Sequence, residues 1–409
     1  MIEQRRVVVI GAGPSGAIAA AILKRKGNDV LVLEKQTFPR FSIGESLLPH
    51  CLDFIEEAGM LPQVENYGFQ IKNGAAFARG DEYSIFDFGD AFTDGKKYAY
   101  EIRRAEFDKL LADSAAEQGV EIRYQHEIIT TNFQEDSARL TVKDQQGEIY
   151  QVQAEFVLDA SGYGRVLARL LALETPSELP VRQAVFTHIE DRITHPAFER
   201  DKILITVHPE LNDVWFWLIP FSDGRSSIGV VGLDRYFSQF GDDLSACLHH
   251  FVDTTPSLKR IVSDAKWDTP CSKLFGYSAN VKQLFGQRFA LLGNSAEFLD
   301  PVFSSGVTIA MHGASLAANL LDRQLRGQQV DWKSEFADPL QQGVDTFKTY
   351  VMGWYDLSFQ RAVFWQNKSR HIERMISSLL AGYAWDENNP FVADHKAKLA
   401  ALSQFCVEK

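Results

Sequence analysis

The sequence predicts an α/β protein that combines a parallel sheet near the N-terminus, a second sheet of antiparallel strands and a helical C-terminal region. The parallel sheet is indicated by a β-branched run, Val7 to Ile10, which leads through a glycine-rich turn into an alanine-rich helix. The antiparallel sheet is indicated by strand-like runs at 184–188, 203–208, 214–219 and 227–233. From Val307 onward the apolar spacing becomes helical. A chain of 409 residues is long enough for two or three domains or one large composite fold.

Composition and charge narrow the class of function. The 42 basic and 54 acidic side chains give a formal net charge of −12 and a pI near 5.4. A protein that binds nucleic acid or an anionic membrane would normally carry a basic surplus. No stretch has the length of a membrane span, and the apolar run that ends at Gly11 is too short for a signal peptide. We therefore expect a cytoplasmic protein with no nucleic-acid partner and no membrane span.

Cysteines and histidines show no metal-ligand spacing. The four cysteines lie far apart without a C-x-x-C pair, and none of the ten histidines lies in an H-E-x-x-H pattern. Widely spaced cysteines of this kind are typical of free thiols in a reducing compartment. We expect no metal site.

The glycine-rich turn has the pattern of a dinucleotide site. Residues 11–16 read Gly-Ala-Gly-Pro-Ser-Gly and satisfy G-x-G-x-x-G directly after a strand and before a helix. In a Rossmann-type unit the first glycine allows a tight turn, the second lets the pyrophosphate approach the backbone, and the third lets the helix pack against the strand. The candidate phosphate-binding residues are therefore Gly11, Gly13, Pro14, Ser15 and Gly16.

A second strand, Val30 to Leu33, is followed by Glu34 and Lys35. Glu34 lies 23 residues after Gly11, where an acidic side chain would accept both ribose hydroxyls of an adenosine. A carboxylate there disfavours a 2′-phosphate, so the ligand is FAD or NAD rather than NADP. No second G-x-G-x-x-G with strand and helix context follows, and we expect no separate nicotinamide-binding domain.

The segment after the second strand, residues 38–49, reads Phe-Pro-Arg-Phe-Ser-Ile-Gly-Glu-Ser-Leu-Leu-Pro. Its composition alone is that of a polar loop capped by serine before a helix. It resembles the corresponding segment of the flavin-dependent halogenases and their close relatives in the FAD-dependent monooxygenase superfamily. The resemblance selects FAD as the dinucleotide and adds Arg40, Ser42 and Ile43 to its expected contacts.

Two further segments resemble the same family in chain order. Arg104 begins an R-x-x-F-D helix start whose arginine contacts FAD in the family, although an arginine there is also compatible with the surface of an amphipathic helix. A D-A-S-G turn follows the strand Phe156 to Leu158, and without the family it would be only a strand-ending turn. The expected contacts in this turn are Asp159, Ala160, Ser161 and Gly162.

A third segment follows another buried strand, Phe289 to Leu292. Gly293 and Asn294 stand where the superfamily has G-D, whose aspartate binds the ribityl chain of the flavin. Asn can still hydrogen-bond to a ribityl hydroxyl but carries no charge. Glu297 in the same loop would repel a halide if its carboxylate pointed inward, or it points to solvent.

The helix start after this loop resembles the one beneath the flavin ring in the family. Backbone N–H groups at such a helix start stabilise negative charge on a reduced flavin or a bound halide. The expected contacts here are Pro301, Ser305, Gly306 and Val307.

Three features of the resemblance concern the reaction. Residues 215–220 fit W-x-W-x-I-P, although Trp215 and Trp217 on one strand face are also what a sheet core would show. Lys72 stands in a K-x-G-A context like that of the lysine thought to hold hypohalous acid, although a lone lysine beside a strand is usually a solvated end. The third is the signature F-x-x-P-x-x-S-x-G, carried by Phe298, Pro301, Ser304 and Gly306.

The resemblance implies an FAD-dependent oxidoreductase of the halogenase-like monooxygenase type, as found in secondary metabolism. It would use reduced FAD, O2 and a halide, chloride or bromide, on an electron-rich aromatic substrate that is free or carrier-bound, and a separate flavin reductase would supply the reduced FAD. Lys72 would deliver the oxidised halogen, and Ser304, Trp215 and Trp217 would be the other catalytic residues. The alternatives are a hydroxylase or a double-bond reductase or desaturase on the same scaffold, and a non-catalytic FAD-binding accessory protein.

The resemblance also implies a p-hydroxybenzoate hydroxylase-like domain arrangement. Residues 1–75, 98–174 and 280–330 would form a discontinuous Rossmann-type FAD-binding domain, and residues 76–97 and 175–279 an antiparallel β-sheet substrate domain. Residues 331–409 would form a C-terminal helical region. Aromatic residues recur from Phe347 to Trp365, and we expect this apolar helix face to pack as core rather than to line a substrate cavity.

Overall fold

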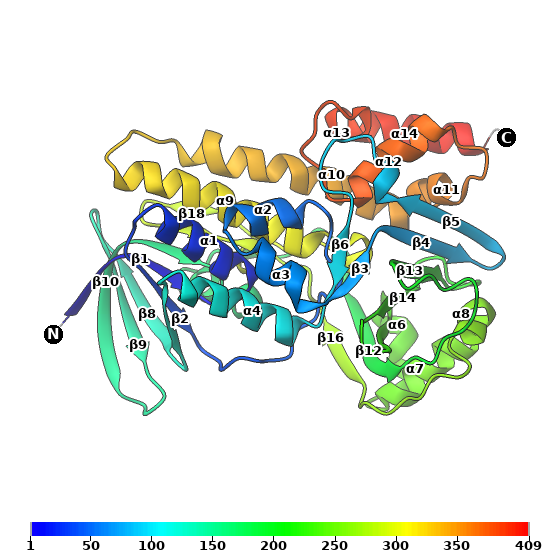
Figure 1. The fold of residues 1–409 in the computed structure, drawn as a ribbon, viewed down its shortest axis with the longest axis horizontal. Helices are drawn as coiled ribbons and strands as arrows, with labels where there is room; N and C mark the ends of the chain where they lie inside the picture. Colours follow the sequence, from blue (N-terminus) through cyan, green and yellow to red (C-terminus); the bar gives the residue numbers. More distant parts are fainter. Residues whose placement is uncertain (1, 408–409) are drawn as a thin grey trace.

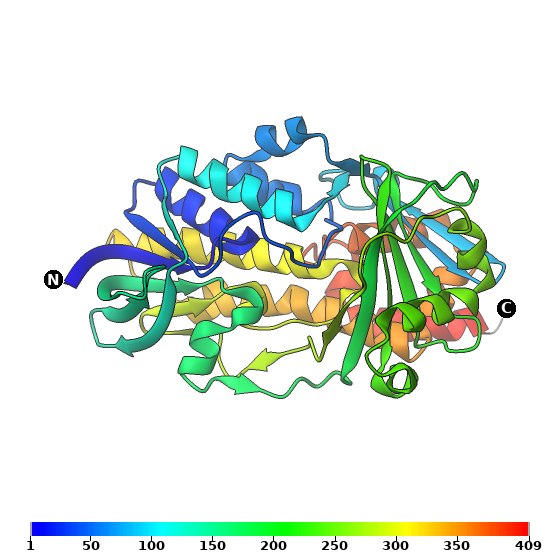
Figure 2. The same cartoon turned by 90° about the horizontal axis from the view of Figure 1, so that it is seen from below.

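The computed structural model describes residues 2–407, in which two large sheets stand next to each other along the long axis of the molecule (Figures 1 and 2). Helices α9 (Ser305–Leu325) and α10 (Asp338–Tyr355) run along one side of the molecule (Figure 1). Within residues 2–407, no helix is long and apolar enough to cross a membrane. The same residues contain no group of three or more His, Cys, Asp or Glu side chains that could hold a metal ion.

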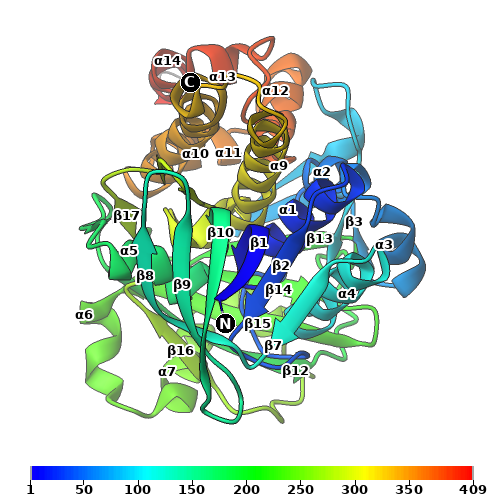
Figure 3. The same cartoon turned by 90° about the vertical axis from the view of Figure 1, so that its left-hand side faces the viewer.

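The N-terminal sheet has a parallel centre. Alternate residues of β1 pack in different layers: Val7 and Val9 belong to the core that contains buried residues of α1 (Pro14–Arg25) and α9, whereas Val8 and Ile10 pack with buried residues of β8 (Glu127–Phe133) and β9 (Ala138–Lys143). Figure 3 shows these strands and helices in an end-on view. Both faces of β1 are therefore covered, which explains its uninterrupted β-branched run. The strand order is β18 (Phe285–Gly286), β19 (Phe289–Leu291), β10 (Ile149–Asp159), β1 (Ile2–Ile10), β2 (Val30–Glu34) and β7 (Glu121–Tyr124). Strand β9 also pairs with β10, and β8 pairs with β9.

The second sheet is antiparallel apart from one pair. Strands β4 (Gly74–Arg79) and β13 (Lys202–Val207) are parallel, because the long chain between them is able to return to the same end of the sheet. One face of this sheet packs against the large core, and the other against α7 (Leu244–Asp253) and α8 (Pro256–Ile261). The strand order is β16 (Ser272–Phe275), β12 (Arg182–Glu190), β15 (Arg225–Leu233), β14 (Trp215–Pro220), β13 (Lys202–Val207), β4 (Gly74–Arg79) and β5 (Glu82–Asp87).

Shorter elements connect the two sheets. A two-stranded ribbon pairs β3 (Gln70–Lys72) with β6 (Ala99–Glu101), and another pairs β11 (Glu174–Thr175) with β17 (Asn280–Val281). The remaining helices are α1 (Pro14–Arg25), α2 (Cys51–Glu57), α3 (Leu61–Tyr67), α4 (Arg104–Glu117), α5 (Val166–Leu170), α6 (Asp234–Phe237), α11 (Ser358–Phe364), α12 (Arg370–Leu380), α13 (Pro390–Ala393) and α14 (His395–Val407).

The aromatic segment from Phe347 to Trp365 is split between two helices. Leu357 has a left-handed conformation, with φ of +72°, and separates α10 from α11. The expectation of a core role is confirmed for most of the aromatics, since Phe347, Tyr350, Trp354, Phe359 and Phe364 are buried. Tyr355 differs from them, because its hydroxyl accepts a hydrogen bond from Trp215 Nε1 at 2.9 Å and thereby joins the C-terminal region to the second sheet.

Two histidines in the core should make folding sensitive to acid. The rings of His50 and His312 lie 5.7 Å apart, and His312 packs 4.1 Å from Trp385. Burial lowers the pKa of His50 to about 4 and that of His312 to about 3, with the His50 charge adding to the effect on His312. His312 Nδ1 is buried without a hydrogen-bond partner.

Below pH 6.5 the two histidines should therefore be protonated in the unfolded chain while they stay neutral in the folded chain. We expect the free energy of unfolding to fall as pH drops from about 6.5 towards 4, by up to about 1.4 kcal/mol per pH unit for each histidine. His312→Phe should lose less stability than the wild type between pH 7.5 and pH 5. Urea unfolding at the two pH values measures this, and equal losses in both proteins would contradict it.

Candidate active site

A cavity of about 750 Å3 lies between the two sheets. It opens at the carboxyl ends of β1, β2 and β10, which is where ligands bind in parallel α/β sheets. Its size is within the usual range for a cofactor or ligand site, roughly 300–1,000 Å3. The expected residues that line it are Gly11, Gly13, Pro14, Ser15, Glu34, Lys35, Arg40, Ser42, Ile43, Arg104, Ala160, Ser161, Gly162, Trp215, Trp217, Asn294, Pro301, Ser304, Gly306 and Val307.

The glycines of the first loop have different tasks. Gly11 has a φ of +93°, and a Cβ there would lie 2.7 Å from the Ala160 carbonyl oxygen. A Cβ on Gly16 would lie 2.0 Å from the Gly11 carbonyl oxygen, so Gly16 allows α1 to pack against the loop and does not itself line the cavity. Beside Gly13 the only atom within 4 Å is Arg40 Nη2, at 3.5 Å. The space at Gly13 is therefore open, as a pyrophosphate requires.

Glu34 is buried at the end of β2 with its carboxylate towards the glycine loop. Its Oε2 accepts from the Ala12 N–H at 2.9 Å, and its Oε1 accepts from the Gln36 N–H at 2.8 Å. Each carboxylate oxygen can accept more than one hydrogen bond, so both can also receive a ribose hydroxyl. Lys35 lies at the exposed rim, where it pairs with Glu127 at 2.7 Å.

Two guanidinium groups are held at the cavity wall by one buried carboxylate. Arg104, at the start of α4, binds Asp108 through Nε at 2.8 Å and Nη2 at 3.0 Å, and donates from Nη1 to the Ile43 carbonyl at 2.7 Å. Arg40 Nη1 lies 3.3 Å from the same carboxylate. These cations beside the open space at Gly13 suit a pyrophosphate, because guanidinium groups bind phosphate oxygens strongly.

Asp159 shapes its turn instead of facing the cavity. Its Oδ1 accepts from the Ser161 N–H at 2.9 Å and its Oδ2 from the Leu167 N–H at 2.7 Å, and the side chain is fully buried. These two bonds fix the turn whose next residues line the cavity. Asp159 itself does not line the cavity, and its contact with the cofactor stays a prediction.

The start of α9 closes the cavity on one side. Ser304 has a left-handed φ of +56° immediately before the helix, and Ser304, Gly306 and Val307 line the cavity. Gly293 and Ser305 lie behind this wall: a Cβ on Gly293 would lie 2.6 Å from Ala310 Cβ, and Ser305 is buried. Glu297 does not line the cavity; burial raises its pKa to about 7, against the opposing effect of Lys348.

The two tryptophans form an apolar wall opposite the glycine loop. Trp215 and Trp217 are buried on the same face of β14 and line the cavity. Trp217 Nε1 donates to Ser227 Oγ at 2.9 Å, and its ring lies across Gly229, where a Cβ would be 2.3 Å from ring carbon. With both indole N–H groups already bonded inside the protein, the wall offers only ring surface to a ligand.

Lys72 lies behind this cavity. Its side chain is 1% exposed, and Nζ donates to Ser46 Oγ at 2.7 Å and to the Leu47 carbonyl at 2.9 Å. It lines a separate space of only about 10 Å3, and two of the surrounding side chains are Phe77 and Phe303. A space of this size holds no more than one water molecule.

Several residues that line the cavity were not predicted from the sequence to belong to the site. Those with ionisable side chains are Glu45, His126, Glu127, Tyr163, Arg169 and Tyr277. Glu45 lies within the 38–49 segment and its adjacent residues are neutral, so its isolated carboxylate could have been recognised from the sequence as a candidate site residue. Tyr277 comes from a loop with no sequence pattern of its own, and only the tertiary structure brings it to the cavity.

The fold and the cavity define an FAD-binding protein. Residues 4–335 match the family model described as FAD binding domain. The chain belongs to the flavin-dependent halogenase-like family of FAD-dependent oxidoreductases.

Similar proteins support this membership. The tryptophan 2-halogenase of Chondromyces crocatus is 30% identical over 83% of this chain, and the match spans 65% of that relative's length. The 1H-pyrrole-2-carbonyl-[peptidyl-carrier protein] chlorinase of Pseudomonas fluorescens is 26% identical, over 97% of this chain and 93% of its own.

Solved structures agree. A flavoprotein/dehydrogenase from Cytophaga hutchinsonii superposes with a TM-score of 0.95 and 40% identity, with 99% of each chain covered. The myxobacterial chondrochloren halogenase CndH gives a TM-score of 0.76 and 26% identity, with 99% of this chain and 97% of that chain covered.

Proposed function

We propose that the protein is a halogenase that uses reduced FAD, O2 and chloride or bromide to halogenate an electron-rich aromatic compound. The proposal is carried by the position of Lys72. Ser304, Ile203 and Ile205 line both the large cavity and the small space at Lys72, so the amine lies directly behind the wall of the cofactor cavity. An amine in this position suits transfer of an oxidised halogen towards a substrate.

The residues of the large cavity fit FAD. Glu34 would hold the adenosine ribose, Arg40 and Arg104 the pyrophosphate, and the first turn of α9 the flavin ring or a halide. FAD supplies the oxygen chemistry when it is bound. The chain's contribution is to orient the ring, to exclude water with the tryptophan wall and to hold the amine of Lys72 ready.

The second sheet favours a neutral, apolar substrate. The cavity face of that sheet carries mainly aliphatic and aromatic side chains, among them Phe186, Ile203, Ile205, Trp217 and Ile219. Both tryptophan N–H groups are used inside the protein, so this wall has no free donor for the carboxylate of an amino acid. A carrier-bound aromatic acyl group, such as the substrate in the name of the Pseudomonas relative, also meets this requirement.

The electron source provides the first test. We expect little direct oxidation of NADH or NADPH, because the sequence carries a single G-x-G-x-x-G motif with strand and helix context, and Trp215 and Trp217 line the cavity that would hold the flavin. Anaerobic flavin bleaching should be slow with the isolated protein and at least about tenfold faster with an added flavin reductase, a difference of about 1.4 kcal/mol in barrier. Rapid bleaching without the reductase would contradict the two-component halogenase.

A second candidate function is a hydroxylase, reductase or desaturase on the same scaffold. The observation that favours it is the space of about 10 Å3 at Lys72, because an aromatic ring cannot enter without a rearrangement of Phe77, Phe303 or Leu380. A substrate of such an enzyme would stay in the large cavity and never reach the amine.

Product analysis separates the two functions. The protein, FAD and a flavin reductase are incubated with a panel of phenols, pyrroles and indoles, free and carrier-bound, with and without bromide. When bromide is present, mass spectrometry should find a brominated product, and when bromide is absent it should find none. An oxygenated or dehydrogenated product that forms equally well without halide would establish the second candidate.

A further inference from the structure

Lys72 has a carboxylate neighbour on the adjacent strand. In the antiparallel β3–β6 ribbon, Lys72 is opposite Ala99 and Gln70 is opposite Glu101, which places Lys72 and Glu101 on the same face. Both side chains are 1% exposed. Neither oxygen of Glu101 has a hydrogen-bond partner, so this carboxyl group is buried without being bound in place. The charges of the two groups act on each other without a direct ion pair between them, so a proton would need a third group to pass from one to the other.

Ser46 connects this pair to the large cavity. Its Oγ accepts the hydrogen bond from Lys72 Nζ, which leaves the hydroxyl hydrogen free to be donated onward. Ser46 lies next to Glu101, with which it forms an antiparallel β-bridge. Ser46 and its neighbour Glu45 both line the large cavity, whereas Lys72 does not.

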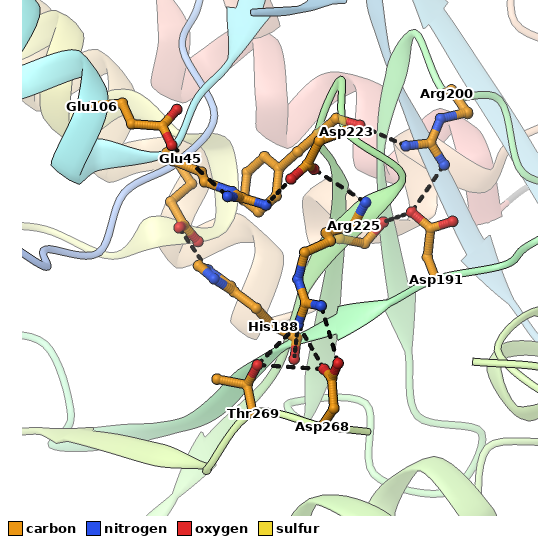
Figure 4. A network of polar contacts seen from close by, with 12 residues as sticks. Glu45, Glu106, His188, Asp191, Arg200, Asp223, Arg225, Asp268 and Thr269 are labelled. Atoms are coloured by element: carbon orange, nitrogen blue, oxygen red, sulfur yellow. Dashed lines mark hydrogen bonds and ion pairs between the residues drawn. The ribbon is translucent and has the colours of Figure 1, made fainter. Parts of the chain in front are cut away.

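Glu45 precedes Ser46 in the chain, and its side chain contacts His188. It is 2% exposed, and its Oε1 is hydrogen-bonded to His188 Nε2 at 2.8 Å, while Oε2 is buried without a partner. Figure 4 shows His188 between Glu45 and the ion pair of Arg225 with Asp268. The His188 side chain is 19% exposed and packs at 6.2 Å from Phe41, which is itself 59% exposed. His188 is therefore the end of the connection that solvent reaches.

We propose that His188, Glu45, Ser46 and Glu101 form a proton route from solvent to Lys72. A proton passes from His188 Nε2 to Glu45 Oε1, and Glu45 releases it to the Ser46–Glu101 pair. Glu101 then holds the proton next to the amine of Lys72 and returns it when the amine needs it. The value of this route to the enzyme rests on the proposed halogenation.

Halogenation consumes protons from solvent, as the balanced reaction shows. O2 accepts four electrons, two from reduced FAD (FADH2) and two from the halide, and forms two water molecules. The aromatic carbon loses its hydrogen and gains the halogen. The balance takes up one proton from solvent in each turnover, whereas hydroxylation with the same O2 and FADH2 takes up none.

The charges around the route set its protonation. Burial lowers the pKa of Lys72, whereas Glu101 and then Cys51 on α2 act to raise it. Burial raises the pKa of Glu101 to about 7, against the effect of Lys72 and with a smaller contribution from Glu45. Arg104 on α4 is the cation whose charge also interacts with Glu45. Glu101 thus changes charge near neutral pH, the range in which a proton store is useful.

The first experiment needs neither FAD nor a substrate. Protein labelled with 15N at lysine Nζ is titrated by NMR, and the Lys72 signal is the one that Lys72→Met lacks. We expect Glu101→Gln to lower the Lys72 midpoint by one pH unit or more, about tenfold in proton affinity, because the neighbouring carboxylate is lost. Glu45→Gln and His188→Gln should slow hydrogen exchange of the Lys72 ammonium with solvent severalfold. Glu148→Gln, on an exposed turn, should change neither.

An unchanged midpoint in Glu101→Gln would overturn the proposal, and so would unchanged exchange in both of the other variants. If Glu101→Gln does not fold, the exchange rates in Glu45→Gln and His188→Gln decide the question. Those two changes leave the β3–β6 ribbon intact.

The second experiment uses the FAD-loaded enzyme with a flavin reductase. Glu45→Gln and His188→Gln should give less halogenated product per O2 consumed and more hydrogen peroxide, and the deficit should grow as pH rises and protons become scarcer. A ratio equal to that of the wild type at every pH would overturn the route. If the wild type makes no halogenated product, the proposed function fails, while the Lys72 titration still decides whether the route exists.

Discussion

We expect the Gly13→Val protein to fold normally and to bind FAD at least about a hundredfold more weakly than the wild type, a loss of ~2.7 kcal/mol or more. Gly13 has φ of −66° and ψ of −175°, a conformation that valine adopts without strain. Near its Cβ position lies only the flexible end of Arg40, at 3.5 Å. The valine methyl groups would instead occupy the space that the pyrophosphate needs.

Gly16→Ala is the matched control for this prediction. Its Cβ would lie 2.0 Å from the Gly11 carbonyl oxygen, so this change should destabilise the fold itself. FAD titration by visible absorbance and thermal unfolding of the FAD-free proteins measure the two effects separately. Gly13→Val should lose binding alone, and a Gly13→Val protein that binds FAD at wild-type strength would disprove the location of the phosphate site.

Lys72→Ala should abolish halogenation and leave the earlier steps intact. We expect halogenated product to fall by about 10²–10⁴-fold, the usual contribution of a group that handles protons or reactive species directly. FAD binding and O2 consumption should continue, because Lys72 does not line the large cavity. Hydrogen peroxide should then accumulate where the wild type forms product, and both are measured in the same reaction.

The Lys72→Met variant is the control for loss of packing. Alanine would leave a hole beside Phe88, whose ring centre lies 5.6 Å from Lys72 Nζ, and the large-to-small change would itself destabilise the protein by roughly 2–5 kcal/mol. Methionine keeps most of the volume but has no amine. Product loss in both variants would show that halogenation requires the amine. Halogenation that persists in Lys72→Met would show that the lysine serves only packing.

The cofactor end of the cavity follows from local sequence. The tight turn at Gly11, the open space at Gly13 and the carboxylate of Glu34 depend on a strand, a loop and a helix that are consecutive in the chain. Steric demands within about 30 residues determine such a unit, so its pattern is visible in the sequence. Asp159 differs from its neighbours in this turn, because its carboxylate accepts hydrogen bonds from two backbone N–H groups and does not line the cavity.

The reactive end was decided by tertiary structure. Lys72, Glu101, Ser46 and His188 come from segments that only the packing of the two sheets brings together. The sequence predicted a lysine near the site by resemblance, but its burial behind Ser304 and its carboxylate neighbour depend on the β3–β6 register. Burial in the surrounding core lowers the pKa of Lys72 and raises that of Glu101, and this burial depends on several segments packed together. The sequence by itself thus determined which cofactor the protein holds, because the parts of that site are consecutive in the chain, whereas only the fold decided that Lys72 is buried on the same face as Glu101.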